Sequence, residues 1–280
     1  MIDKEVENIF MPGSEWLYYK LYCGEKTADD ILLDVIRPLV TNLLDKQIID
    51  KWFFIRYSDP EPHLRIRFHL IDQKKIGKLM IRIKEQFLPL LNSNQVWNIQ
   101  LATYKRELNR YGASTIEIAE SYFFYDSQEA IKTIEQSENN EKKRFLLAFM
   151  LIENCINSFI PDKEKAIVFL NDRQLSFKKE FKIDSKSKKK LAQKYRVFIE
   201  EIKIYKIDKK EVSLSTFKLN CFNNYISLQK NEKKEINIVS VLASFIHMTI
   251  NRNFMSKQRL YEMIIYDFLY KIYKSRYVYN

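Results

Sequence analysis

Basic side chains recur at alternate positions in the segment 51–70. In its second half, Arg65, Arg67 and His69 alternate with apolar residues, and a strand places alternate side chains on the same face. Three potential cations on one face of a strand, with an apolar face behind them, predict a binding site for an anion. A solvated face of an antiparallel sheet is the simpler interpretation, and this pattern alone favours neither.

Further candidate residues lie outside this strand. Arg56, Arg106 and Arg110 lie in or beside predicted strands. Arginine is favoured over lysine where a carboxylate or an enolate oxygen must be held in a fixed, forked geometry. In the second half of the chain, His247 lies in an apolar helical segment, and Asn251 follows one helical turn later on the same face. A lone histidine in an apolar helix is more commonly a hydrogen-bonded core residue, so these residues alone specify no reaction.

The elements that position these residues follow from the spacing of apolar residues. Strands are predicted over residues 16–22, 51–58, 63–70 and 95–105, and helices over 27–44 and 74–88. Pro38 predicts a kink or a break in the first helix, and Pro89 predicts the end of the second, whose inward residues should include Met80. The order strand–helix–strand–strand–helix–strand is that of a ferredoxin-like split βαβ sheet.

The second half of the sequence is almost wholly helical in its pattern. Helices are predicted over residues 144–160, 186–205, 236–251 and 257–273. The sequence therefore predicts an α+β protein with two parts. A ferredoxin-like α+β part covers residues 1–127, and a helical part covers residues 128–280 and shares the same core within one functional domain.

Composition narrows the class of protein. With 46% hydrophobic residues the chain can form a packed interior, which argues against disorder. It has only four glycines, and it contains no glycine-rich phosphate loop, nucleophile elbow or dinucleotide fingerprint. Its formal net charge of +11 favours acidic partners, such as nucleic acid, an anionic membrane surface or an acidic peptide.

The cysteines and the N-terminus indicate the compartment. Cys23, Cys155 and Cys221 are far apart and have no metal-ligand spacing, which fits a reducing cytosol. The N-terminus lacks the basic start and apolar run of a signal peptide. The apolar runs are shorter than the roughly 20 residues that a membrane-spanning helix needs. We therefore predict a soluble cytoplasmic protein with no metal and no cofactor.

Four motifs together resemble one known family. They are Phe54-Ile-Arg-Tyr-x-Asp-Pro-x-Pro-His-Leu-Arg-Ile-Arg-Phe68, Tyr104-x-Arg-Glu-x-x-Arg-Tyr-Gly112, Glu117-x-x-Glu-x-x-Phe-x-x-Asp-Ser127 and His247-Met-x-x-Asn-Arg252. In this order they resemble the C-terminal elimination domain of class I lantibiotic dehydratases, which also occurs as a separate protein in thiopeptide clusters. The family commonly has two glycines after its Arg-Tyr pair, whereas Ala113 follows Gly112 here.

The resemblance implies a lyase acting on a ribosomally made precursor peptide that carries a leader. A separate subunit glutamylates Ser or Thr of the peptide with glutamyl-tRNA. The elimination domain then removes the α-proton and expels glutamate, leaving dehydroalanine or dehydrobutyrine. The chain lacks the large glutamylating region, so we expect it not to catalyse dehydration alone. No DNA partner is expected, and a homodimer is compatible with this assignment.

The family pattern also implies roles for particular residues. Four residues of this sequence match family residues that are implicated in elimination: Arg65, Arg67, Arg106 and His247. Arg65 and Arg67 would hold the glutamyl group or the enolate, Arg106 would assist them, and His247 would transfer a proton as base or as acid. Candidate substrate-binding residues are Arg56, His69, Tyr104, Glu107, Arg110 and Asn251.

Two alternative functions stay open. The first is a thiopeptide pyridine-forming [4+2] cycloaddition enzyme that releases the leader peptide. The arginines and His247 favour elimination, because a cycloaddition has no glutamate to expel. The second is a non-catalytic peptide- or tRNA-binding partner of the glutamylating subunit, which the net charge permits. An exposed strand edge could also accept a leader peptide by β-addition, and the sequence assigns no edge to that role.

Overall fold

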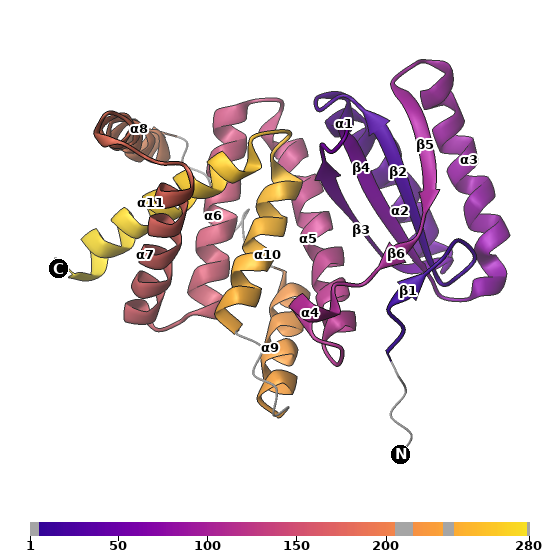
Figure 1. Ribbon diagram of the computed structural model, residues 1–280. Helices are drawn as coiled ribbons and strands as arrows, with labels where there is room; N and C mark the ends of the chain where they lie inside the picture. Colours follow the sequence, from indigo (N-terminus) through magenta and orange to yellow (C-terminus); the bar gives the residue numbers. More distant parts are fainter. Residues whose placement is uncertain (1–5, 205–214, 232–237, 279–280) are drawn as a thin grey trace. The chain divides into compact units, whose positions relative to one another are not determined.

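The computed structural model describes residues 6–204, 215–231 and 238–278 (Figure 1). The chain divides into two compact units. Unit 1 comprises residues 1–135 and 215–256, and unit 2 comprises residues 136–214 and 257–280. The mixed α/β architecture and the helical second half are confirmed. The division of the sequence at residue 127 into two parts of one functional domain stays a prediction.

Unit 1 is built on a four-stranded antiparallel sheet. Its strands are β2 (Trp16–Cys23), β3 (Ile49–Tyr57), β4 (His63–Leu70) and β5 (Val96–Ala102). They lie in the order β3-β4-β2-β5, so β3 and β5 form the two edges (Figure 1). A separate two-stranded sheet pairs β1 (Ile9–Phe10) with β6 (Tyr104–Lys105). The single strand predicted over residues 95–105 is therefore two strands with different partners, because the chain leaves the main sheet at Thr103.

One face of the sheet carries the main core of unit 1. It packs against α1 (Thr27–Asp30), a π-helical segment (Ile31–Ile36), α2 (Arg37–Asp45) and α3 (Ile76–Asn92). The alternate β4 residues Leu64, Ile66 and Phe68 are fully buried in this core. The alternation predicted for β4 is thus confirmed. Burying each such side chain stabilises the fold by about 1.5–3 kcal/mol.

Pro38 and Pro89 both lie within helices and do not end them. The helix stays continuous past Pro38, and the chain widens into the π-helical segment immediately before it, which accommodates the missing backbone donor. The prediction that α3 ends near Pro89 is wrong, because α3 continues to Asn92. Leu90 is buried in the core and holds this last turn in place. Met80, predicted to face inward, is 41% exposed, because its neighbour Leu79 occupies the inward position.

The remaining helices of unit 1 pack around a second aromatic cluster. They are α4 (Leu108–Tyr111), α5 (Ile116–Ser137, which continues into unit 2), α9 (Thr216–Asn231) and α10 (Ile238–Asn253). The ring of Phe245 on α10 contacts Tyr122 on α5 and Tyr111 on α4, with centroids 4.1 and 5.6 Å away. α10 also contacts the edge strand β3. This packing brings the His247 segment next to the sheet.

Unit 2 is helical in its described residues. It contains α6 (Glu141–Phe159), α7 (Lys163–Glu180), α8 (Ser185–Ile204) and α11 (Gln258–Val278). Phe149 on α6, Phe198 on α8 and Phe268 on α11 belong to one aromatic cluster. The predicted helix ends at Tyr205 and Ile236 lie outside the described residues. Within those residues, no helix combines the length and the apolar character needed to cross a bilayer.

Candidate active site

The sheet face opposite the helical core carries the predicted arginines. Because Leu64 and Ile66 face the core, Arg65 and Arg67 lie on the other face of β4. On β2, Tyr18 stands opposite Arg67. On β3, Phe53 stands opposite Arg67. The strand pairing therefore surrounds Arg67 with aromatic side chains from both neighbouring strands.

Arg67 is a buried cation enclosed by aromatic rings. Its guanidinium carbon lies 4.4 Å from the ring centre of Tyr18, 4.8 Å from Tyr104 and 5.1 Å from Phe53. Burial lowers the pKa of Arg67, against smaller opposing effects of Tyr104 and Tyr18. Among the described residues, its buried Nε and Nη1 atoms have no hydrogen-bond partner. Unused donors on a buried guanidinium are costly to keep, and they are suited to receive an anion.

A small cavity adjoins Arg67. Its volume is about 50 Å³, and Tyr104, Glu107, Met248 and Arg252 contribute to its lining together with Arg67. A cavity of this size has room for a few water molecules or for a carboxylate group. The end of an anionic side chain would thus fit beside Arg67, while the rest of a peptide would stay outside.

Arg65 lies on the same face in a more open position. Its Nε donates to Nε2 of His63 at 3.0 Å, and its guanidinium carbon lies 3.5 Å from the ring centre of Tyr57. The Nδ1 atom of His63 is 2.7 Å from the carbonyl oxygen of Glu61, so we assign the proton to Nδ1. Burial lowers the pKa of His63, and the charge of Arg65 lowers it further. A neutral His63 thus orients Arg65.

Arg106 points its donors at a carboxylate rather than at the cavity. Its Nε and Nη2 donate to the two oxygens of Glu120 at 2.8 and 2.7 Å, and its Nη1 donates to the carbonyl oxygen of Glu7. The hydroxyl of Tyr104 also donates to Glu120 at 2.8 Å. Burial by itself would lower the pKa of Arg106, but Glu120 raises it above the usual value. Glu120 and the Tyr104 ring therefore connect Arg106 to Arg67.

Glu107 and Arg110 form an exposed ion pair beside the cavity, with Nε and Oε2 3.2 Å apart. Glu107 also belongs to the cavity lining. His69, at the other end of β4, is held by Asp50, with its Nδ1 2.6 Å from the carboxylate. Burial alone would raise the pKa of Asp50, and the hydrogen bond with His69 lowers it below its ordinary value.

Arg56 and Asn251 lie at the edge strand and not on the Arg67 face. Arg56 stands opposite Leu64 on the core side of the sheet, and its Nη2 pairs with Asp29 at 2.5 Å. The side chain of Asn251 accepts from the N–H of Arg56 at 2.9 Å and donates to its carbonyl at 2.8 Å. These bonds satisfy backbone groups at the free edge of β3. The contacts of both residues thus support a role in holding the edge strand.

A buried ionic network stands behind the cavity. The carboxylate of Asp126 binds Nζ of Lys218 at 2.6 Å and Nη1 of Arg252 at 2.7 Å, and all three side chains are fully buried. Thr249 donates to the same carboxylate. Burial by itself would raise the pKa of Asp126, but Lys218 and Arg252 lower it below its ordinary value. Arg252 also donates to the carbonyl oxygen of Phe54, which joins the network to β3.

His247 is half-buried on α10. Its neighbour Met248 lines the cavity, whereas His247 itself is not among the lining residues. One turn later, Asn251 holds the edge of β3. The structure thus brings Arg67, Tyr104 and Glu107 to one cavity, with Arg65 on the same face, and places His247 on the helix beside it.

Sequence reasoning missed three residues that shape the site. They are Tyr18, His63 and Glu120, which enclose Arg67, orient Arg65 and hold Arg106. His63 and Glu120 lie within the motifs. Their residue type and their position in those motifs were the only features of the sequence that could have identified them. Tyr18 could be found only from the register of β2 against β4, which no local pattern specifies.

Comparison with known proteins places these residues in context. The sequence model of a family described as lantibiotic biosynthesis dehydratase, C-terminal, matches residues 16–273. The chain is 30% identical over 172 residues to the nisin biosynthesis protein NisB of Lactococcus lactis subsp. lactis, covering 58% of this chain and 16% of NisB. It is 27% identical over 183 residues to the subtilin biosynthesis protein SpaB of Bacillus subtilis, covering 64% of this chain and 18% of SpaB. The alignments therefore span less than a fifth of these relatives.

Solved structures share the fold. The tRNA-dependent lantibiotic dehydratase MibB from Microbispora sp. 107891 superposes with a TM-score of 0.75 and 19% identity, covering 96% of this chain and 29% of MibB. The pyridine synthase TbtD from thiomuracin biosynthesis superposes with a TM-score of 0.69 and 11% identity, covering 95% of this chain and 100% of TbtD. At these identities the similarity concerns the fold alone.

Proposed function

Since the chain belongs to the family of lantibiotic biosynthesis dehydratase C-terminal domains, we propose that it eliminates glutamate from glutamylated Ser or Thr of a precursor peptide. The products are dehydroalanine or dehydrobutyrine. The observation that carries this proposal is the buried guanidinium of Arg67, which has unused donors and belongs to the lining of a cavity that can admit a carboxylate. A separate glutamylating subunit that uses glutamyl-tRNA would supply the substrate.

The reaction requires stabilisation of negative charge at two places. A base removes the α-proton, the electrons of that bond form the Cα=Cβ double bond, and the Cβ–O ester bond breaks. Glutamate then leaves as a carboxylate. Charge develops first on the amide oxygen as an enolate and then on the leaving carboxylate. Preorganised guanidinium donors in a site with little water stabilise both charges.

The contacts support distinct roles for the site residues. Arg67 would hold the enolate or the glutamate carboxylate, and Arg65 would bind from the open side of the same face. Arg106 would position Tyr104 through Glu120. Glu107, which lines the cavity, and Arg110 would contact the substrate. His247 would transfer the proton, as base or as acid.

The architecture of unit 1 supports a further part of the proposal. The strand order β3-β4-β2-β5, with every neighbouring pair antiparallel, supports a ferredoxin-like split βαβ sheet. In such a sheet β4 is a central strand, flanked on both sides. Arg65 and Arg67 are then held on the most constrained element of the unit, as a preorganised site requires.

Mass spectrometry on a defined substrate tests the proposal. A chemically glutamylated Ser-containing peptide incubated with the purified protein should lose glutamate and yield dehydroalanine. Arg67→Ala and His247→Ala should abolish the loss. Arg196→Ala, which changes an exposed arginine of unit 2, should leave the rate unchanged and serves as the matched control. A wild-type protein that leaves this peptide intact would contradict the proposal.

A second candidate follows from the full-length superposition on the pyridine synthase TbtD. A pyridine-forming cycloaddition joins two dehydroalanines and releases the leader peptide. It expels no glutamate, so it gives the buried donors of Arg67 no carboxylate to bind, and elimination is favoured. Conversion of a multiply dehydrated peptide to a ring product, with no loss of glutamate from the first peptide, would reverse this order. If the protein converts neither peptide, the remaining hypothesis is a non-catalytic binding partner of the glutamylating subunit.

A further inference from the structure

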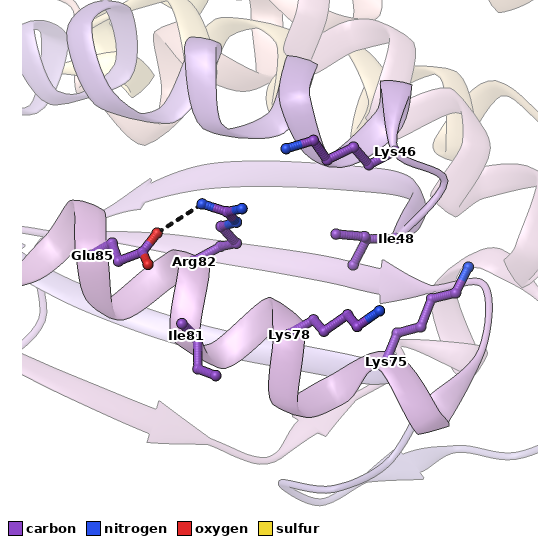
Figure 2. Close-up of a pocket in the computed structure, with 7 residues that line it drawn as sticks. All are labelled: Lys46, Ile48, Lys75, Lys78, Ile81, Arg82 and Glu85. Atoms are coloured by element: carbon purple, nitrogen blue, oxygen red, sulfur yellow. Dashed lines mark hydrogen bonds and ion pairs between the residues drawn. The ribbon is translucent and has the colours of Figure 1, made fainter.

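A second concave surface of unit 1 lies on the helical side of the sheet, away from Arg67. This basic groove lies between the end of α2 and the first turns of α3 (Figure 2). Its volume is about 550 Å³, and its lining consists of Lys46, Ile48, Lys75, Lys78, Ile81, Arg82 and Glu85. Figure 2 shows Lys46 and Ile48 on one side, with the α3 side chains across from them.

The groove carries an excess of positive charge. Four cations face one carboxylate, and that carboxylate, Glu85, is paired with Arg82 at 3.1 Å. Lys75 donates to the backbone carbonyl of Gln47. Lys46 and Lys78 are exposed and form no ion pair with any acidic residue in the described part of the chain. Because two separate elements direct these cations at one hollow, their fields add there, unlike those of scattered surface lysines.

Two aliphatic side chains belong to the lining of the groove. Ile48 is almost fully buried at 6% exposure, whereas Ile81 is 59% exposed. No aromatic side chain lines the groove. Single-stranded nucleic acid is typically bound by a cationic groove with aromatic platforms on which bases stack, and this groove has none. The excess of cations and the two isoleucines together match a peptide that carries both acidic and aliphatic side chains.

We propose that the basic groove binds an acidic, aliphatic-rich segment of the precursor peptide, remote from the residues that are processed. This inference rests on the proposed function of unit 1. The volume lies within the roughly 300–1,000 Å³ of sites that enclose a small ligand, so it suits a few residues of a peptide. A stable interface between folded proteins uses about 20–30 residues a side, many more than line this groove, so a short peptide segment suits it better than a folded partner.

The position of the groove allows one peptide to reach both sites. Ile48 immediately precedes β3, and its carbonyl accepts from the N–H of Ile71 at the end of β4. The peptide would pass around this end of the sheet to the face that carries Arg67. A linker of about twelve residues reaches about 40 Å when extended, which is longer than a sheet and one layer of helices are thick.

Binding of defined probes tests the groove by itself. We expect a fluorescein-labelled ten-residue peptide of Glu and Leu to bind the wild-type protein, and its Gln-for-Glu counterpart to bind weakly. Lys46→Glu combined with Lys78→Glu should weaken binding of the acidic peptide by about tenfold or more. Lys188→Glu combined with Lys189→Glu makes the same charge change on exposed residues of α8 and should change binding little. A ten-nucleotide RNA that binds more tightly than the peptide, and loses binding in the groove variant, would overturn the inference.

Elimination kinetics separate this inference from the proposed function. A short glutamylated peptide is compared with the same peptide joined through a twelve-residue Gly/Ser linker to the acidic segment. The tethered peptide should have the lower KM, and the groove variant should raise that KM to the value for the short peptide without changing kcat. Equal KM values for both peptides would reject the groove as a substrate site while leaving elimination intact. If neither peptide reacts, the proposed function fails, and the binding assay alone then decides whether the groove takes the acidic peptide.

Discussion

The buried cations of unit 1 fall into two groups with different surroundings. Around Asp126, Lys218 and Arg252 face a carboxylate at ion-pair distance. Around the small cavity, Arg67 faces three aromatic rings and has no carboxylate partner among the described residues. Removing one partner of a buried ion pair is strongly destabilising, because the other charge stays buried. Lys218 and Arg252 are thus held by ion pairs, although Arg252 also lines the cavity, whereas Arg67 has no ion pair to lose when it binds a ligand.

Arg106 shows that residue type alone does not place an arginine in either group. It lies one residue from the cavity-lining Glu107, yet its forked donors bind Glu120. The same Glu120 holds the hydroxyl of Tyr104, whose ring covers Arg67. Arg106 and Arg67 are thus joined through one carboxylate and one tyrosine.

Replacing Arg67 by Met should have the largest effect on activity. The methionine keeps apolar packing against the three rings and removes every donor, so glutamate elimination should fall by about a hundredfold to a thousandfold. The free energy of unfolding should change by less than about 1 kcal/mol, because no ion pair is lost. Rate assays and urea unfolding measure the two quantities. Strong destabilisation with unchanged activity per folded molecule would mean that Arg67 serves stability and not catalysis.

Asp126→Asn should give the reverse pattern. It leaves Arg252 buried without its carboxylate and Lys218 paired with Glu129 alone, so the free energy of unfolding should fall by about 3–5 kcal/mol. Urea unfolding of this variant, with Asp172→Asn on the exposed surface as control, measures the change.

The pH dependence of stability gives a second test of Asp126. The pKa of Asp126 is lowered in the folded protein. Its contribution to the free energy of unfolding is therefore complete above the ordinary Asp pKa of about 3.9, and it is lost as the pH falls through the lower pKa of the folded state. Asp126→Asn should remove this part of the acid sensitivity. An unchanged acid-unfolding profile would show that the carboxylate is not the group that titrates.

Glu120→Gln should reduce activity by about tenfold to a hundredfold, because a displaced Tyr104 ring shifts the Arg67 guanidinium from its productive position. Combined with Arg106→Ala, it should cost little more than either change alone, since both residues act through the same contact. Steady-state kinetics of the two single variants and the double variant measure this coupling. Fully additive losses would mean that Arg106 contacts the substrate independently.

His63→Gln should have the smallest effect. A glutamine can still accept from Arg65 and donate to the carbonyl of Glu61, so activity at neutral pH should fall by about threefold or less. Because the pKa of His63 is lowered in the folded protein, wild-type stability is complete above the ordinary histidine value of about 6.5 and declines as the pH falls below it. The variant should lack this decline below about pH 6.5, which thermal unfolding at several pH values would reveal.

Some features of the site were predictable because they are local. The two-residue period of β4 places Arg65 and Arg67 on the face opposite Leu64 and Ile66, and the structure confirms this arrangement. The same reasoning failed at Pro89 and Met80. There, the packing of Leu79 and Leu90 into the core outweighed a helix-breaking residue and a simple apolar pattern.

The family and the face on which the two strand arginines lie could be read from the sequence, because motif spacing and strand periodicity are properties of short segments. The unused donors of Arg67, the binding of Arg106 by Glu120 and the contact of Asn251 with the backbone of Arg56 became known only from the folded chain. Asn251 and Arg56 are 195 residues apart in the chain. Contacts over such separations depend on strand register and on the packing of the whole unit, and no local pattern encodes either.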